Sequence, residues 1–305
     1  MEISTRWKPA AFALLILIWG LGYPMIKIGL EYAPPILFAG IRTLLGGFIV
    51  AIVAYLWGGA PHFKRHWRHY LILAILNVML YNGLSTFSLF YLPSGVAAIL
   101  LYVQPIVVSV LAWQFAGESF SVQKGLGLIC GFAGVVSLSL ESLFGGMSFI
   151  GVAVSVIAAI SWAMATVYFK VIQNQVSTLW TIAWQFLIGG TVLSLLGFSM
   201  ESWSQIDWTG AFWTSLLYQS CAAVALAWVL WLGLIRAGEA GRVASLTFLI
   251  PLVSVAIGLL FLDERLTPSL FIGAALVVSG VYLVNRQSQS GADQEAEKSV
   301  DVSHS

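Results

Sequence analysis

Two basic residues, Lys27 and Arg42, stand inside apolar stretches of the sequence, where a charge is costly to bury and usually has a function. At 1.5 Å per residue, Lys27 lies about 25 Å along the first apolar stretch, and Arg42 lies about 10 Å into the second, which runs back in the opposite direction. Lys27 can extend its ammonium group to a membrane interface. Arg42 is deeper, so it is expected to face the interior of a helical bundle or a transport pathway.

Acidic residues are missing from the apolar stretches. No Asp or Glu falls well inside any of them, and all four histidines, His62, His66, His69 and His304, lie in polar segments. A cavity between these stretches would therefore have only positive fixed charges and no buried carboxylate to relay protons. We predict a substrate whose carboxylate or other anionic group pairs with Arg42, with Lys27 as a second candidate for the same pairing.

Other polar and aromatic side chains in the apolar stretches are candidates for a cavity wall. Asn77 and Asn82 stand out because an amide that faces lipid is costly, although hydrogen bonds between helices would satisfy them equally well. The predicted cavity residues are Trp19, Tyr23, Lys27, Arg42, Asn77, Tyr81, Asn82, Tyr102, Gln104, Trp162, Gln185, Tyr218 and Thr247. Further candidates of the same kind are Thr166, Gln219 and Trp228.

Two prolines, Pro105 and Pro251, fall in the middle of apolar stretches and predict kinked helices. Each proline removes a backbone hydrogen bond and frees the carbonyl group four residues earlier, at Leu101 and Thr247. Inside a bilayer these carbonyls need a partner from protein, water or substrate. The kinks therefore either line a cavity or serve packing alone.

Two carboxylates, Glu118 and Glu264, come after the proline-containing stretches and before the next ones. A carboxylate at a helix N-terminus is stabilised by the helix dipole, so each is predicted to cap the helix that follows it. A role in gating or in proton coupling is the alternative, since an ionisable group at the membrane edge is inexpensive to keep.

The composition predicts a membrane protein. Hydrophobic residues make up 59% of the 305 residues and charged residues 9%, whereas soluble domains contain about 25% charged residues. The net charge of +1 gives no sign of a nucleic-acid partner. Cys130 and Cys221 both lie in apolar stretches and fit neither a disulfide framework nor a metal-ligand spacing. We expect a lipid bilayer as partner, and no cofactor or metal.

Ten stretches have the roughly 20 mainly apolar residues that a helix needs to cross a bilayer. They run from Ala10 to Leu30, Pro35 to Trp57, Tyr70 to Tyr91, Ser94 to Gly117, Gly125 to Leu140, Phe149 to Phe169, Ser177 to Met200, Gly210 to Ile235, Val243 to Leu262 and Pro268 to Val284. Segments on one side of these spans contain Arg6, Lys8, Lys64, Arg65, Arg68, Lys124, Lys170, Arg236, Arg242, Arg286 and Lys298. Loops on the other side contain only Arg265. This asymmetry predicts a multi-pass protein of the cytoplasmic membrane with both termini in the cytoplasm.

The two halves of the chain share residues at a constant spacing. Trp19, Lys27, Arg42 and Gly46-Gly47 recur 143 positions later as Trp162, Lys170, Gln185 and Gly189-Gly190. Gly95, Ala98, Pro105, Glu118, Gly127 and Gly134 recur 146 positions later as Gly241, Ala244, Pro251, Glu264, Gly273 and Gly280. Because each half would contain an odd number of helices, the second half would enter the membrane from the other side. We predict an all-α bundle of ten transmembrane helices in two inverted five-helix repeats, residues 1–143 and 144–286, and a disordered cytoplasmic tail at 287–305.

Two segments, PSGVAAIL beginning at Pro93 and GEAGRVASL beginning at Gly238, are each followed by a proline and a glutamate at matching distances. They resemble the paired signatures of the EamA family, part of the drug/metabolite transporter superfamily. The resemblance covers nearly the whole chain. It implies a ten-helix exporter-like carrier without ATP-binding domains, commonly for amino acids or other metabolites. Ser119-Phe120 departs from the Arg-Leu that usually follows the first motif glutamate.

The sequence thus predicts a secondary transporter, and no enzyme, that exports amino acids or related small metabolites by alternating access. The first, third, fourth, sixth, eighth and ninth spans are the expected cavity walls, the second joins through Arg42, and the fifth and tenth are peripheral. Small residues at Gly127 and Gly131, and at Ala275 and Ser279, suit close helix pairing, either within one chain or in a homodimer.

Two other functions remain as alternatives. A membrane-embedded enzyme for lipid or isoprenoid substrates would need a His/Asp cluster, a nucleophile motif or a metal-ligand set, and the sequence offers no such group near the membrane surface. A sensor would need a signalling domain, and a tail of about twenty residues is too short to form one.

Overall fold

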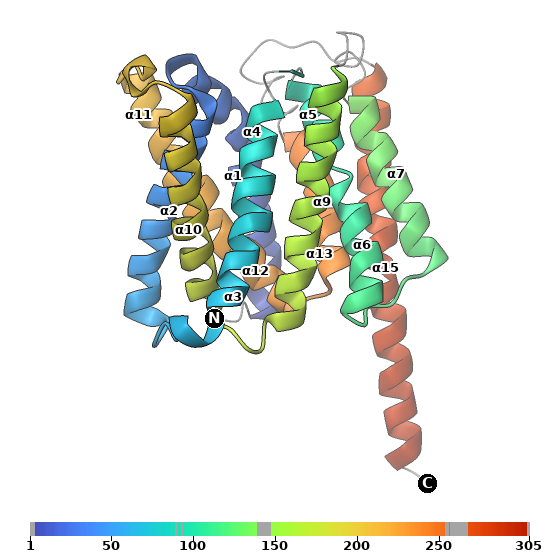
Figure 1. Ribbon diagram of the computed structural model, residues 1–305. Coiled ribbons are helices and arrows are strands. Elements are labelled where there is room, and N and C mark those ends of the chain that lie inside the picture. The colour runs from blue at the N-terminus through green and yellow to red at the C-terminus, as the bar shows by residue number, and fades with distance from the viewer. Residues whose placement is uncertain are drawn as a thin grey trace.

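The protein is a bundle of helices that run between two ends, as the computed structural model in Figure 1 shows. The structure describes residues 4–88, 91–92, 94–138, 148–253, 256 and 268–303, with side chains in the last segment described as far as Arg286. In these ranges the chain forms helices and turns and no strand. The end that holds the N terminus, at the bottom of Figure 1, is called the lower end here, and the opposite end is the upper end. The tail predicted to be disordered, residues 287–305, begins after Arg286, the last residue whose side chain is described.

The described elements fall into the two halves of the chain. The first half contains η1 (Thr5–Trp7), α1 (Lys8–Tyr32), α2 (Pro35–Trp57), α3 (Phe63–Leu73), η2 (Ala74–Gly83), α4 (Leu84–Ser88), α5 (Ser94–Leu101), α6 (Gln104–Phe115) and α7 (Val122–Leu138). The second half contains α9 (Phe149–Ile172), α10 (Thr178–Met200), η3 (Trp203–Gln205), α11 (Gly210–Leu217), η4 (Tyr218–Leu226), α12 (Ala227–Ala237), α13 (Ala240–Ser245), η5 (Leu246–Leu249) and α15 (Pro268–Ser303).

Six continuous helices in the described ranges are long and apolar enough to cross a bilayer. They are Lys8–Tyr32, Pro35–Trp57, Phe63–Ser88, Phe149–Ile172, Thr178–Met200 and Gly210–Ala237. Shorter apolar helices are Ile99–Phe115, Val122–Leu138, Ala240–Val253 and Phe271–Arg286. The chain is therefore a multi-pass membrane protein, while the number ten for its spans stays a prediction.

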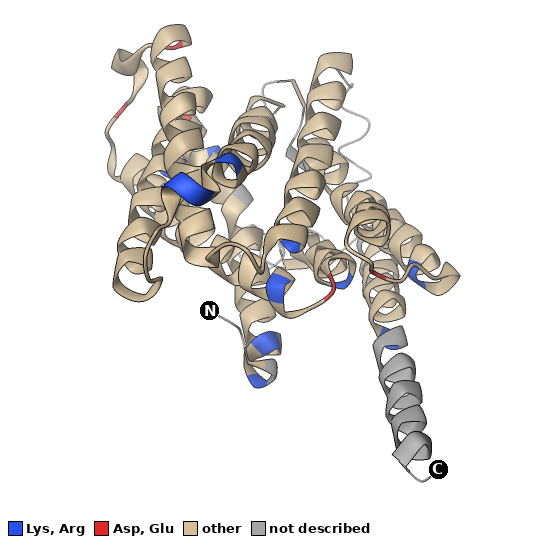
Figure 2. Cartoon of the chain, turned by 60° about the horizontal axis from the view of Figure 1, so that its bottom comes forward, with Lys and Arg blue, Asp and Glu red and all other residues tan. Residues whose placement is uncertain are grey.

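The outside of the bundle is apolar. Phe149 is 86% exposed, Ile52 62% and Phe48 53%, although such side chains are normally buried in a soluble protein. An apolar exterior fits hydrocarbon, where the backbone must satisfy its hydrogen bonds within each helix. Apart from Lys27 in α1 and Arg42 in α2, the charged residues of the described part lie mostly near the helix ends, with many lysines and arginines at the lower end (Figure 2).

Two helix pairs pack backbone against backbone at glycines. In the pair α2 and α10, a Cβ atom on Gly47 would lie 2.9 Å from the nitrogen of Leu187, and one on Gly190 would lie 2.7 Å from the nitrogen of Leu44. In the pair α7 and α15, a Cβ atom on Gly127 would lie 2.8 Å from the carbonyl oxygen of Gly280. The small face of α7 thus pairs within the chain, which answers a question that the sequence left open.

Two segments, η2 and η4, are wound as π-helix in the middle of longer helices. A π-helical turn loosens the regular hydrogen-bond ladder and is frequent at functional sites. Side chains bond to carbonyl groups in these segments: within η2, Asn82 Nδ2 donates to the carbonyl of Asn77 at 2.7 Å, and Trp19 Nε1 of α1 donates to the carbonyl of Ala223 in η4 at 3.2 Å. The sequence analysis did not predict either segment.

The two motif prolines alter their helices in different ways. Pro105 lies in the first turn of α6, and a turn at Tyr102 and Val103 separates α6 from α5, so the helix is interrupted rather than kinked. Pro251 follows the 3₁₀ segment η5, where the amide of Ile250 donates to the carbonyl of Thr247. That 3₁₀ bond satisfies a carbonyl that the sequence analysis expected to be free.

Candidate functional site

A cavity lies between the two halves of the chain. It leaves about 80 Å³ in which the centre of a water molecule could lie, which is room for several waters. Its wall is made by Trp19, Gly22, Ile26, Arg42, Tyr81, Asn82, Ser85, Thr86, Ala97, Leu101, Tyr102, Trp162, Gln219, Ala223, Val224, Trp228 and Ile250. These residues come from α1, α2, η2 to α4, α5, α9, η4 to α12 and the segment after η5. Neither α7 nor α15 contributes a lining residue in the described ranges, as expected for peripheral helices.

Arg42 provides positive charge in the cavity wall and is 4% exposed. Its Nη1 donates to Gln219 Oε1 at 2.9 Å, and its Nη2 donates to Asn82 Oδ1 at 3.4 Å and to Thr86 Oγ1 at 3.3 Å. Gln219 and Asn82 belong to the two π-helical segments, and Gln219 Nε2 in turn donates to the carbonyl of Gly22 at 2.7 Å. These three partners are neutral side chains, and they orient the guanidinium group.

Aromatic rings form another part of the wall. Trp162 stacks on Tyr81 with ring centroids 4.7 Å apart and meets Trp19 edge-on at 5.6 Å. Trp19 also contacts Trp228 at 6.1 Å. The indole Nε1 of Trp162 is buried and has no acceptor among the described residues. An apolar or aromatic group fits this wall, and the indole N–H is a donor that a bound carboxylate or carbonyl would satisfy.

The remaining predicted cavity residues lie outside this wall. Asn77 and Gln185 are both buried and bond to each other, from Asn77 Nδ2 to Gln185 Oε1 at 2.9 Å, so they join η2 to α10. Tyr218 donates its hydroxyl group to the carbonyl of Ile18 at 2.8 Å, and Thr247 donates to the carbonyl of Ala244 at 2.8 Å.

Two further candidates, Lys27 and Gln104, also fall elsewhere. Lys27 is exposed, which agrees with an ammonium group that reaches the interface. Gln104 is fully buried and does not line the cavity. The side chain of Tyr23 lies outside the described part.

Ser85 and Thr86 line the cavity, although the sequence analysis did not single them out. They follow Asn82 by three and four residues, the spacing that puts side chains on the same face of a helix. With Asn82 taken as a cavity residue, this helical spacing would have predicted Ser85 and Thr86 as its neighbours in the cavity wall.

Below the cavity, apolar side chains fill the bundle. Trp231 is fully buried and contacts Trp19 and Trp162 with centroids 5.5 Å apart in both pairs. Leu15 on α1 lies about one turn closer to the lower end than Trp19, and Val243 on α13 lies about two turns closer to it than Ile250; both line the same small pocket as Trp231. We call Leu15, Trp231 and Val243 the apolar plug. Along their helices these side chains lie between the cavity residues and the lower end.

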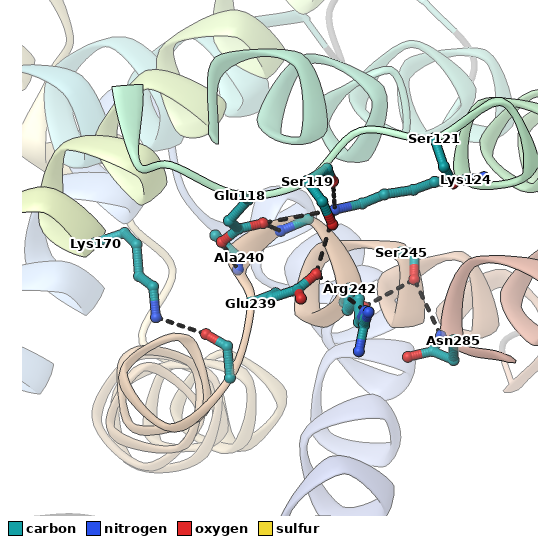
Figure 3. A network of polar contacts seen from close by, with 12 residues as sticks. Glu118, Ser119, Ser121, Lys124, Lys170, Glu239, Ala240, Arg242, Ser245 and Asn285 are labelled. Atoms are coloured by element: carbon teal, nitrogen blue, oxygen red, sulfur yellow. Dashed lines mark hydrogen bonds and ion pairs between the residues drawn. The ribbon is translucent and has the colours of Figure 1, made fainter. Parts of the chain in front are cut away.

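A polar network lies below the plug, around the turn that joins α12 to α13 (Figure 3). Glu118 accepts hydrogen bonds from two successive amides in the first turn of α13, from Ala240 N to Oε1 and from Gly241 N to Oε2, the latter at 3.0 Å. Lys170 donates to the last carbonyls of α12, to Ile235 at 3.0 Å and Gly238 at 2.6 Å.

Ion pairs extend the network to α7. Lys124 Nζ lies 3.6 Å from Glu118 Oε2 and 3.5 Å from Glu239 Oε2, and Arg242 Nε lies 3.0 Å from Glu239 Oε2. Lys124 is 3% exposed, although the sequence analysis treated it as a loop residue. Its burial follows from the two carboxylates, which offset the loss of hydration.

The predicted role of Glu118 needs a correction. It caps a helix, but that helix is α13 in the other half of the chain and not α7, which follows it in sequence. The order of residues along the chain predicts a cap for α7, the helix that follows Glu118. The tertiary fold instead brings the start of α13 within hydrogen-bonding distance of the Glu118 carboxylate. Glu264 lies outside the described residues.

The described residues contain no group of three or more His, Cys, Asp or Glu side chains placed to bind a metal ion. The polar groups of the site are instead suited to binding a small molecule by hydrogen bonds, charge and ring contacts.

Comparison with known proteins agrees with this arrangement. The profile of the EamA-like transporter family matches residues 7–140 and again 149–286. The chain is 44% identical to the "Uncharacterized transporter YvbV" of Bacillus subtilis, with 91% of each chain covered. It is 29% identical to a "Probable amino-acid metabolite efflux pump" of Escherichia coli, over 90% of this chain and 94% of the relative. A solved structure titled "Crystal structure of protein" shares the fold with a TM-score of 0.81 at 20% identity, covering 94% of this chain and 99% of that one. The chain belongs to the EamA-like transporter family.

Proposed function

We propose that the protein is a secondary transporter that exports amino acids or related small metabolites by alternating access. The observation that carries this proposal is the cavity between the two halves, whose wall contains both the Arg42 guanidinium and a group of aromatic rings. The printed name of the Escherichia coli relative, an amino-acid metabolite efflux pump, supports the substrate class.

The proposed architecture is a ten-helix bundle of two inverted repeats, residues 1–143 and 144–286. Reciprocal contacts support it. Gly47 contacts Leu187. Adding 143 to the first residue number and subtracting 143 from the second gives the pair Gly190 and Leu44, which is also in contact. With a spacing of 146, the contact of Gly127 with Gly280 becomes that of Gly273 with Gly134, and both of these also occur. Such reciprocity is expected when two halves are related by a twofold axis in the membrane plane.

The proposed substrate has an anionic group and an apolar or aromatic body. A carboxylate would pair with Arg42, and the body would lie against Tyr81, Trp162 and Trp228. Because these groups line one cavity, a single small molecule can contact both.

The lower end is proposed to face the cytoplasm. In the described ranges this end holds Lys8, Lys64, Arg65, Arg68, Lys124, Lys170, Arg236 and Arg242, whereas the loops of the upper end carry acidic residues such as Glu201 and Asp207. Basic residues favour the cytoplasmic side of a membrane.

The test is transport in proteoliposomes with a panel of labelled amino acids, each compared with its uncharged amide. Arg42→Gln should lower kcat/KM for the acid by about tenfold to a hundredfold, because a charge-assisted hydrogen bond contributes about 1.5–3 kcal/mol, and it should affect the amide much less. Lys27→Gln is the matched control, since it removes an exposed positive charge outside the cavity wall. Equal effects of Arg42→Gln on acid and amide would contradict the proposed pairing, and no flux for any compound would contradict the transport function.

A further inference from the structure

We infer that Glu118 and Lys170 form a gate at the lower end, which holds the turn between α12 and α13 closed and must release it before the cavity can open to that side. This inference rests on the proposed function, because a gate matters only if the cavity opens in turn to each side. The two side chains are called the clamp, and residues Ala237–Gly241 are called the corner.

The clamp matches the electrostatics of the corner. The C-terminal carbonyls of α12 carry partial negative charge and receive the ammonium group of Lys170, whose bonds to Ile235 and Gly238 measure 3.0 and 2.6 Å. The N-terminal amides of α13 carry partial positive charge and receive the carboxylate of Glu118. One carboxylate and one ammonium group therefore hold both helix ends at the same turn (Figure 3).

The clamp also joins parts of the chain that must separate if the lower end opens. Glu118 comes from the connection between α6 and α7 in the first half, whereas the amides that it accepts belong to the second half. Lys124 strengthens this link by lying near both Glu118 and Glu239. A movement of the corner away from α7 would break these contacts together.

Movement of the corner is connected to the cavity through the helices that meet there. Trp231 of the apolar plug lies on α12 three residues after Trp228, which lines the cavity, and Val243 of the plug lies on α13. When the corner moves outward, both plug residues move with it. The contacts of the clamp are polar, so water can replace them, which makes this closure reversible.

Accessibility of a single cysteine tests the gate without any substrate. Cys130 and Cys221 are replaced by alanine, Ser85→Cys places a thiol in the cavity wall, and a membrane-impermeant maleimide is added to oriented vesicles from the side of the N terminus. Glu118→Gln and Lys170→Met should each raise the labelling rate from that side by about tenfold, since each weakens charge-assisted hydrogen bonds. Lys170→Arg keeps the charge and should label at the parent rate.

Glu201→Gln is the matched control. Glu201 also accepts from two successive amides of a helix start in the other half of the chain, Ile36 N at 3.0 Å and Leu37 N at 2.7 Å, but at the upper end. It should leave labelling from the side of the N terminus unchanged. If Glu201→Gln raises that rate as much as Glu118→Gln does, the effect is general loosening and the gate is refuted.

A second measurement works in the opposite direction and does not depend on weakening the fold. In the same background, Glu118→Cys and Ala240→Cys are combined and oxidised, which should fix the corner and lower labelling of the cavity from the side of the N terminus below the parent rate. Unchanged labelling after verified cross-linking, or parent-like rates in both Glu118→Gln and Lys170→Met, would overturn the inference. If the protein transports substrate but labelling is unchanged in these experiments, the proposed transport function stands and only the gate is refuted. Failure of the gate can therefore be distinguished from failure of the proposed function.

Discussion

Replacing Gly280 by alanine should destabilise the protein by separating α7 from α15. A Cβ atom at position 280 would lie 2.6 Å from the carbonyl oxygen of Gly127 and 2.6 Å from the Cα atom of Gly131. Both are backbone atoms, so no side-chain rotation relieves the contact. The helices must move apart by roughly 0.5–1 Å, and a gap of that size removes about a quarter to a half of the dispersion energy at each affected contact.

The expected size of the effect comes from two opposing terms. Overpacking a close contact costs about 1–3 kcal/mol, and a backbone neighbour places Gly280→Ala toward the upper part of that range. Alanine returns about 1 kcal/mol through its higher helix propensity. The net loss should be about 1–2 kcal/mol, equivalent to a thermal midpoint about 2–6 °C lower in mild detergent.

Gly125→Ala on α7 is the matched control. A Cβ atom there would lie 3.6 Å from the ring of Phe120, an ordinary contact, so only the gain in helix propensity remains. Its midpoint should stay level or rise by about 1–3 °C. Thermal unfolding followed by tryptophan fluorescence measures both variants. A rise at both positions, or an equal fall at both, would show that close backbone packing does not hold this pair together.

Three more outcomes follow from single contacts. Trp162→Phe keeps the ring but removes the indole donor, so KM for carboxylate substrates should rise by about fivefold to tenfold in the transport assay, and an unchanged KM would exclude the indole from binding. Asn77→Leu and Gln185→Leu should each lower the free energy of unfolding by about 1–3 kcal/mol, because each leaves a buried amide unpaired. In a double-mutant cycle, the double variant should lose about 0.5–1.5 kcal/mol less than the sum of the two single losses. Strict additivity of the two losses would contradict the hydrogen bond. Glu201→Ala removes the acceptor for two amides at the start of α2 and should lower stability by about 1–2 kcal/mol, measured as a lower thermal midpoint, whereas an unchanged midpoint would show that water caps the helix as well.

The depth and environment of Arg42 were predictable because its position depends on helix rise and on the cost of burying a charge. Apolar runs of about 20 residues likewise locate helices well, since the bilayer imposes that length. The helix that contains Asn77 begins at Phe63, earlier than the predicted Tyr70, because its first turns carry Lys64, Arg65 and other polar residues that lie outside the apolar run. Span boundaries from hydropathy mark the apolar part of a helix and not its ends.

The partners of the charged residues were not predictable. The sequence places Glu118 before α7, and only the fold shows that the start of α13 is within reach of its carboxylate. The π-helical segments were missed for a similar reason: their widened turns are stabilised by bonds from distant residues, such as Trp19 to the carbonyl of Ala223, and apolar periodicity does not reveal such bonds.

One of the two spacings found in the sequence relates Arg42 of the cavity wall to Gln185, which lies outside that wall. Trp19 and Trp162 are related by 143 positions and contact each other, so this pair of rings lies where the proposed twofold axis would pass. Arg42 is related by the same spacing to Gln185, and each bonds an amide in a π-helical segment, Gln219 and Asn77. A symmetric ancestor would have two equivalent polar sites beside the ring pair. With arginine at one and glutamine at the other, Arg42 lines the cavity whereas Gln185 forms a buried hydrogen bond, so under the proposed pairing the anionic group of a substrate would bind at one of the two related positions only.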